Sequence, residues 1–236
     1  METMARAGTG TSVLIWILFS AAWILIIRRK RKERLKTGSR INAAGFGIFP
    51  AVAAWKLFEP YTGMSAAGKT LFREAQAGFF LSPEGQILPW RIELIAALAG
   101  FLAIIIWVMI RKDEMPGNGD LLLTVLCIWG AIRSVTEYIR EYPVRPVYVN
   151  PLICTAVAAE IIALAVWTVR RGRKQKSAGL TALEWAAVLA CGAVAVILEA
   201  GIFSLGSEPA NLATITGCAI LSATLVLFAG KDSREV

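Results

Sequence analysis

The chain has 236 residues, of which 56% are hydrophobic and only 18% are charged. This balance excludes an ordinary soluble domain and indicates an integral membrane protein. The net charge of +8 does not indicate a nucleic-acid partner, because the basic residues stand in short runs beside apolar segments.

Two features of the composition limit the chemistry. The chain contains no histidine, which excludes imidazole-based acid–base catalysis and imidazole metal ligands. Its four cysteines lie singly within apolar segments, without the paired spacing of a metal or redox site. We therefore expect no metal site built on histidine or paired cysteines and no disulfide framework.

Seven apolar segments have about the length needed to cross the roughly 30 Å hydrocarbon core of a bilayer. They predict an all-α fold, a polytopic transmembrane bundle of about seven helices. The segments are Thr11–Ile27, Ile41–Phe58, Ile92–Ile110, Leu121–Tyr138, Tyr148–Val169, Thr181–Phe203 and Ala210–Gly230.

The basic run Arg28–Lys36 follows the first segment, and further basic residues follow the third, fifth and seventh segments. The positive-inside rule then predicts the N-terminus outside and the C-terminus in the cytoplasm. A cleavable signal peptide carries its basic residues before the apolar run, whereas here they come after it. The first segment is therefore expected to remain as a membrane helix.

Charged residues flank the long loop between the second and third segments. Lys56 and Glu59 stand at the expected outer end of the second segment, and Arg91 and Glu93 begin the third. Taken singly, each is explained by snorkelling to the interface. Together with the fourth segment, they predict one outward-facing cavity that is open to lipid.

The loop itself, residues 59–90, is expected to lie outside. Loops of this length are more often functional than incidental. Its Gly78–Leu81 stretch has the composition of a short interfacial element. A surface flap that fills space between helices is the other interpretation.

The fourth segment ends in a stripe of charged residues. Arg133, Glu137 and Arg140 have the spacing i, i+4 and i+7, which places them on one helical face. Ionisable side chains at membrane depth are costly and usually functional. Two arginines around an acid suit the phosphate of a lipid headgroup. The same pattern also fits an ion pair that holds neighbouring helices together.

The fifth segment carries an acid, and the last two segments form a separate part of the chain. Glu160 falls near the middle of the fifth, where a carboxylate must be paired or protonated, so it either pairs with Arg133 or belongs to a proton path. A basic linker then precedes two helices rich in Ala, Val, Leu and Gly. We predict a core over residues 1–174 and an appended two-helix transmembrane hairpin over residues 175–236.

The stretch Trp129–Glu141, WGAIRSVTEYIRE, resembles a signature of the bacterial prolipoprotein diacylglyceryl transferases. That signature runs Tyr-Gly-x-x-Arg-Phe-x-x-Glu-x-x-Arg-Glu, and the chain departs from it at Trp129 and Ser134. Upstream, Pro89–Glu93 and the Pro-Gly turn after the third segment are similar to further family elements. The resemblance covers roughly residues 13–174. The family's His-Gly-Gly element and its first two helices have no counterpart, and two extra helices follow.

The resemblance implies a plasma-membrane enzyme of lipoprotein biosynthesis. Such enzymes move a diacylglyceryl group from phosphatidylglycerol to a cysteine thiol of a prolipoprotein, without metal or cofactor. By resemblance, Arg133 and Glu137 are the catalytic residues, with Glu137 holding the two arginines on the lipid phosphate. The expected lipid-binding or substrate-binding residues are Lys56, Glu59, Arg91, Trp129 and Arg140.

The missing histidine leaves no evident base for the thiol, so two alternatives stand beside diacylglyceryl transfer. One is a non-catalytic lipid-binding or scaffold subunit of a membrane complex. The other is a small transporter, which Glu160 at mid-membrane suggests. The expected partners are an anionic phospholipid and a prolipoprotein signal peptide, with no nucleic acid.

Overall fold

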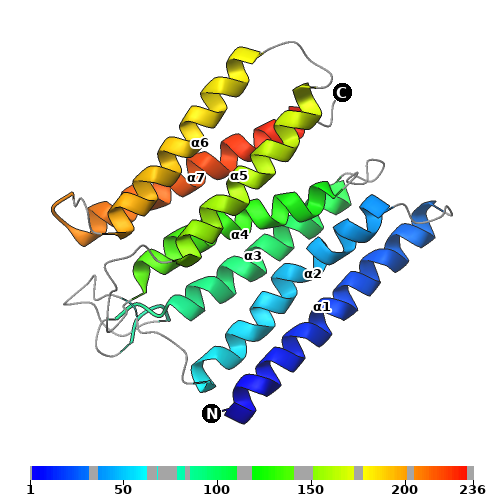
Figure 1. The fold of residues 1–236 in the computed structure, drawn as a ribbon. Coiled ribbons are helices and arrows are strands. Elements are labelled where there is room, and N and C mark those ends of the chain that lie inside the picture. The colour runs from blue at the N-terminus through cyan, green and yellow to red at the C-terminus, as the bar shows by residue number, and fades with distance from the viewer. Residues whose placement is uncertain are drawn as a thin grey trace. The chain divides into compact units, whose positions relative to one another are not determined.

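The computed structural model describes residues 2–31, 37–62, 68, 79–82, 86–110, 119–140, 151–172, 178–200 and 205–232. Within these ranges it contains seven α-helices and one short 3-10 helix, and its only extended pairings are two isolated bridges (Figure 1). The predicted all-α helical bundle is therefore confirmed. The elements are α1 (Glu2–Arg31), α2 (Thr37–Phe58), η1 (Glu59–Tyr61), α3 (Pro89–Ile110), α4 (Asp120–Ile139), α5 (Pro151–Gly172), α6 (Ala178–Glu199) and α7 (Glu208–Asp232).

Several of these helices have the length and hydropathy of membrane spans. Among the described residues, five helices can cross a membrane, and the apolar part of α6, Ala182–Leu198, is shorter. Leu14, Leu18 and Leu25 are exposed along α1, with a spacing that keeps them near one face, as lipid contact requires. The chain is therefore a multi-pass membrane protein.

The helix ends differ from the apolar segments in a consistent way. Helix α1 begins at Glu2 rather than Thr11, and α2 begins at Thr37 rather than Ile41. Hydropathy marks only the residues that suit the hydrocarbon core, whereas backbone hydrogen bonding continues into polar residues. The expected start of α5 at Tyr148 and the expected end of α6 at Phe203 lie outside the described residues.

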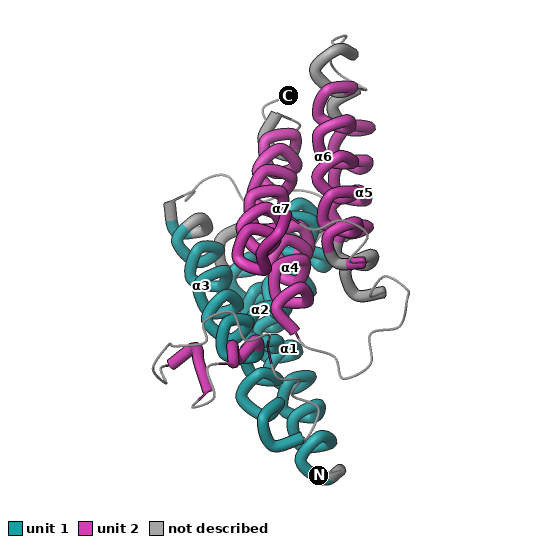
Figure 2. The backbone as a smooth tube through the Cα atoms, turned by 90° about the vertical axis from the view of Figure 1, so that its left-hand side faces the viewer, with its two compact units in different colours: residues 1–65, 90–125 teal, residues 66–89, 126–236 magenta. Residues whose placement is uncertain are grey.

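The chain forms two compact units, which are coloured separately in Figure 2. Unit 1 consists of Met1–Ser65 and Trp90–Val125, and thus holds α1, α2, η1, α3 and the first turns of α4. Unit 2 consists of Ala66–Pro89 and Leu126–Val236, with the rest of α4 and helices α5 to α7. The division into a core over residues 1–174 and a hairpin over 175–236 stays a prediction.

Unit 1 is held by aromatic rings and by close helix approaches. Helix α1 packs along α2. Phe46 on α2 has its ring centroid 4.9 Å from that of Trp23 on α1 and 5.3 Å from that of Phe101 on α3. The amide of Leu121 donates a 3.0 Å hydrogen bond to Asn42 Oδ1. Because the first amides of a helix lack partners within it, Asn42 on α2 caps the start of α4.

Unit 2 packs α5, α6 and α7 against one another. Buried side chains of Tyr138, Leu198 and Ile215 form a cluster that joins α4, α6 and α7. In the loop before Pro89, Leu88 N donates to Phe80 O at 2.9 Å. The neighbouring Phe79 is 59% exposed, and its place in the headgroup zone stays a prediction.

Candidate functional site

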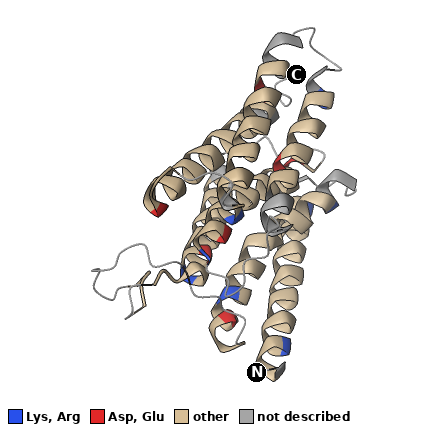
Figure 3. Cartoon of the chain, turned by 60° about the vertical axis from the view of Figure 1, so that its left-hand side comes forward, with Lys and Arg blue, Asp and Glu red and all other residues tan. Residues whose placement is uncertain are grey.

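Charged residues are sparse on the described helices, as Figure 3 shows, so the few buried ones stand out. Apart from Asp120 and Glu160, they gather in two places, one in each unit. The first is the stripe at the end of α4, which belongs to unit 2, and the second joins α2, η1 and α3 in unit 1.

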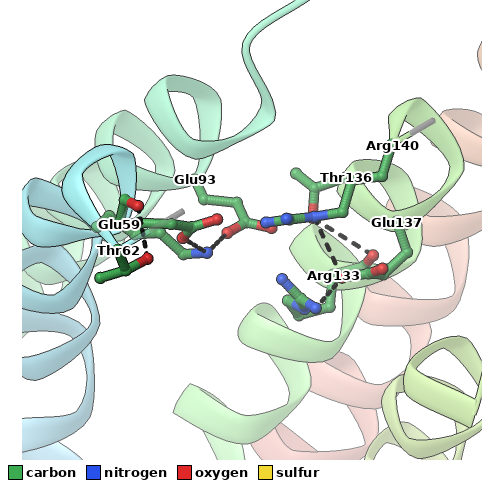
Figure 4. Close-up of polar contacts among 8 residues, drawn as sticks. Glu59, Thr62, Glu93, Arg133, Thr136, Glu137 and Arg140 are labelled. Carbon is green, nitrogen blue, oxygen red and sulfur yellow. Dashed lines mark hydrogen bonds and ion pairs between the residues drawn. The ribbon is translucent and has the colours of Figure 1, made fainter. Parts of the chain in front are cut away.

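The stripe on α4 has the geometry that its spacing predicts. Arg133 forms an ion pair with Glu137, and Arg140 Nε lies 3.5 Å from the same carboxylate oxygen (Figure 4). Glu137 has no exposed surface, and Arg140 is 7% exposed. Two arginines thus flank one buried acid, and these three residues carry one net positive charge.

The end of α4 contacts α7 and the loop that precedes α3. The hydroxyl of Tyr138 donates to the Glu208 carboxylate at the start of α7. Arg140 follows the last residue of the helix, and its backbone forms an isolated antiparallel bridge with Gly68. Gly68 in turn donates to Ile87 O at 2.9 Å. The loop and α7 therefore hold the residues that carry the stripe.

The contacts of Tyr138 and Gly68 were not among the sequence predictions. Glu208 lies seventy residues beyond Tyr138 in the chain, so no helical spacing links the two. The sequence held only a weaker signal, namely a tyrosine beside Glu137 and an acid just before the seventh apolar segment.

The second cluster surrounds Lys56. Its ammonium group forms ion pairs with Glu59 on η1 and with Glu93 on α3, the two acids labelled in Figure 4. All three residues are buried. Thr62 Oγ1 donates to Glu59 O at 2.7 Å. The snorkelling interpretation is wrong for these three residues, because opposite charges within reach of one another allow them to be buried as a group.

The remaining predicted residues make contacts other than the ion pairs of these two clusters. Arg91 lies over the ring of its neighbour Trp90, with Cζ 5.0 Å from the centroid, which is a cation–π contact. Trp129 is half-buried on α4, one turn before Arg133. Glu160 is hydrogen-bonded to Ser222 on α7, so the predicted pairing with Arg133 is wrong.

The structure thus brings Arg133, Glu137 and Arg140 together within unit 2, and Lys56 and Glu59 together within unit 1. The convergence of the two groups on one cavity stays a prediction. Within the described ranges, no three cysteine, aspartate or glutamate side chains are grouped as metal ligands.

Comparisons with protein-family models, with curated proteins and with solved structures gave no match for this chain.

Proposed function

We propose that this chain is a bacterial plasma-membrane protein that binds the phosphate of an anionic phospholipid through Arg133 and Arg140. The observation that carries the proposal is that the buried Glu137 contacts two guanidinium groups, so that two arginines lie side by side at this end of α4. A cationic group at this depth suits an anionic partner, and the phosphate of a lipid is the anion that a membrane supplies.

The chemistry of arginine supports this choice of ligand. A guanidinium group keeps its charge when it is desolvated and meets phosphate oxygens through two parallel N–H bonds. Each of the two guanidinium groups of Arg133 and Arg140 carries five N–H donors. Glu137 orients them, and the Arg133 side chain retains 16% exposure.

The resemblance to the diacylglyceryl transferases extends the proposal to a reaction. In that reaction a cysteine sulfur attacks the lipid glycerol carbon that carries the phosphate ester. A carbon–sulfur bond forms, the carbon–oxygen bond breaks, and glycerol phosphate leaves with the electron pair. Arg133 and Arg140 would stabilise the charge on the leaving phosphate, as fixed donors do in other transfer reactions.

A non-catalytic lipid-binding role is the second candidate, and one observation favours it. The thiol must lose its proton, yet the chain has no histidine and Glu137 is engaged by both arginines. A carboxylate whose oxygen already accepts from guanidinium groups is poorly placed to accept a proton from a thiol as well. In this role the bound lipid would be structural or would recruit a partner.

Two measurements on the purified full-length chain test these proposals. Mass spectrometry of the lipids that co-purify should show phosphatidylglycerol enriched over its share of the membrane. A lipid profile identical to the bulk membrane would exclude specific headgroup binding.

Incubation with phosphatidylglycerol and a lipobox peptide should give a lipidated peptide. Enrichment without lipidation, while an authentic transferase lipidates the same peptide, would leave the non-catalytic role.

The same proposal includes an orientation. With basic residues after the first, third, fifth and seventh segments, the N-terminus lies outside and the C-terminus in the cytoplasm. Arg140 follows the end of α4, which by this orientation lies toward the outer face.

A further inference from the structure

Unit 2 contains a buried acid that the proposed lipid site does not use. Glu160 lies near the middle of α5 and is 4% exposed. Its Oε2 lies 2.6 Å from Ser222 Oγ on α7, whereas its Oε1 is buried without a hydrogen-bond partner among the described residues. An ionised carboxylate with an unsatisfied oxygen is costly in such a place.

The hydroxyl of Ser222 has two acceptors within reach. Glu160 Oε2 lies 2.6 Å from Ser222 Oγ, and the carbonyl oxygen of Ala219 lies 3.2 Å from it. The hydroxyl has a single hydrogen, so these positions allow two arrangements. When Glu160 carries a proton, it donates to Ser222 Oγ, and Ser222 donates to Ala219 O. When Glu160 is ionised, Ser222 donates to Glu160, and the bond to Ala219 O is lost.

Within the part of the chain that the structure describes, no lysine or arginine forms an ion pair with Glu160. On α4, Cys127 Sγ lies 3.8 Å from the carbonyl oxygen of Ala223, the residue after Ser222. Cys127, Cys191 on α6 and Cys218 on α7 are free cysteines, and the first two are buried. Thiols and a hydroxyl are neutral near pH 7.

We propose that Glu160 and Ser222 form a proton-binding site between α5 and α7, distinct from the lipid site on α4. A proton fits this site better than a metal cation does, because cations such as Ca²⁺ and Mg²⁺ require about six oxygen ligands. Binding of the proton turns the Ser222 hydroxyl toward Ala219 and removes the buried charge. The contact between α5 and α7 therefore depends on pH.

Dicyclohexylcarbodiimide, an apolar reagent that modifies protonated carboxyl groups, tests this proposal on the full-length protein in micelles. Peptide mass spectrometry should find Glu160 modified, with a yield that falls as the pH is raised. Ser222→Ala removes the hydroxyl that stabilises the ionised form of Glu160. Labelling of Glu160 in this variant should therefore persist to higher pH. Glu184→Gln, a change at another acid in unit 2, should leave Glu160 labelling unchanged.

Infrared spectroscopy provides a second measurement that does not depend on access of the reagent. The wild-type protein should show the carbonyl band of a protonated carboxylic acid, which weakens at alkaline pH and is missing in Glu160→Gln. The proposal is overturned if neither this band nor labelling of Glu160 is found at any pH. Suppression of labelling by Na⁺ at constant pH and ionic strength would also overturn it, in favour of a metal-cation site.

Discussion

A single carboxylate, that of Glu137, contacts both Arg133 on α4 and Arg140 just after α4, so the contributions of these residues to stability are interdependent. Burying a charge costs several kcal/mol, and the cost is recovered only while the partner is present. Replacing one residue of a buried ion pair should therefore lower the stability of the protein more than replacing both residues does.

A double-mutant cycle on Arg133 and Glu137 measures this dependence. Glu137→Ala leaves Arg133 without its ion-pair partner and should cost about 3–5 kcal/mol of stability. Adding Arg133→Ala should recover part of that loss, with a coupling energy of about 1–3 kcal/mol. Unfolding in detergent gives both values. Pairing Glu137→Ala with Arg28→Ala, an exposed arginine on α1, is the control and should be additive. Additivity in the first pair would mean that Arg133 and Glu137 do not interact.

Replacing Arg133 by lysine separates charge from geometry. The substitution keeps the positive charge but loses the planar fork, so phosphatidylglycerol retention should fall about tenfold, the equivalent of one charge-assisted hydrogen bond. The readout is the ratio of lipid to protein by mass spectrometry after washing in detergent. Arg28→Lys should retain the wild-type ratio. Equal retention in both variants would show that the bidentate geometry of Arg133 is not used.

Among the helix contacts of unit 1, glycine allows a very close approach between α2 and α4. A Cβ atom at Gly45 on α2 would lie 2.7 Å from Leu122 Cα on α4, a backbone atom that cannot turn aside. Gly45→Ala should therefore destabilise the protein by about 1–3 kcal/mol through overpacking. Gly10→Ala on α1, where nothing lies within 4 Å, is the matched control and should be neutral or slightly stabilising. Similar melting temperatures for the two variants would contradict this close contact.

The helices and the charged stripe on α4 could both be predicted from the sequence, because both follow from its local periodicity. Seven apolar runs predict seven helices, and residues four apart, such as Arg133 and Glu137, must meet on a helix. The partners of Lys56 and Tyr138 could not be found in this way. Lys56 meets Glu93 across two helices, and Tyr138 meets Glu208 through the packing of α4 on α7. Such contacts depend on tertiary packing, which no short spacing encodes.

At the scale of the whole molecule, the sidedness of the lipid site depends on the topology in the membrane. The chain should place Ser65 outside and Ser177 in the cytoplasm, because basic residues precede Ser177 and follow α1. Cysteine substituted at Ser65 should react with an impermeant maleimide on intact cells, and cysteine at Ser177 only after lysis. The wild-type chain controls for its four native cysteines. Reaction at Ser177 from outside would reverse the orientation.

The cap that Asn42 places on α4 has a consequence for biogenesis. Asn42 and Leu121 are separated by 79 residues, so the hydrogen bond cannot form until that length of chain has been synthesised. At about 5–20 residues per second, the ribosome needs about 4–16 s to do so. During that interval α2 already carries Asn42, a side chain that is fully buried in the finished structure. A helix with such a polar group is poorly suited to release into lipid by itself. Helix α2 should therefore stay beside the insertion machinery until α4 emerges, so that the two helices enter the bilayer as a pair rather than in chain order.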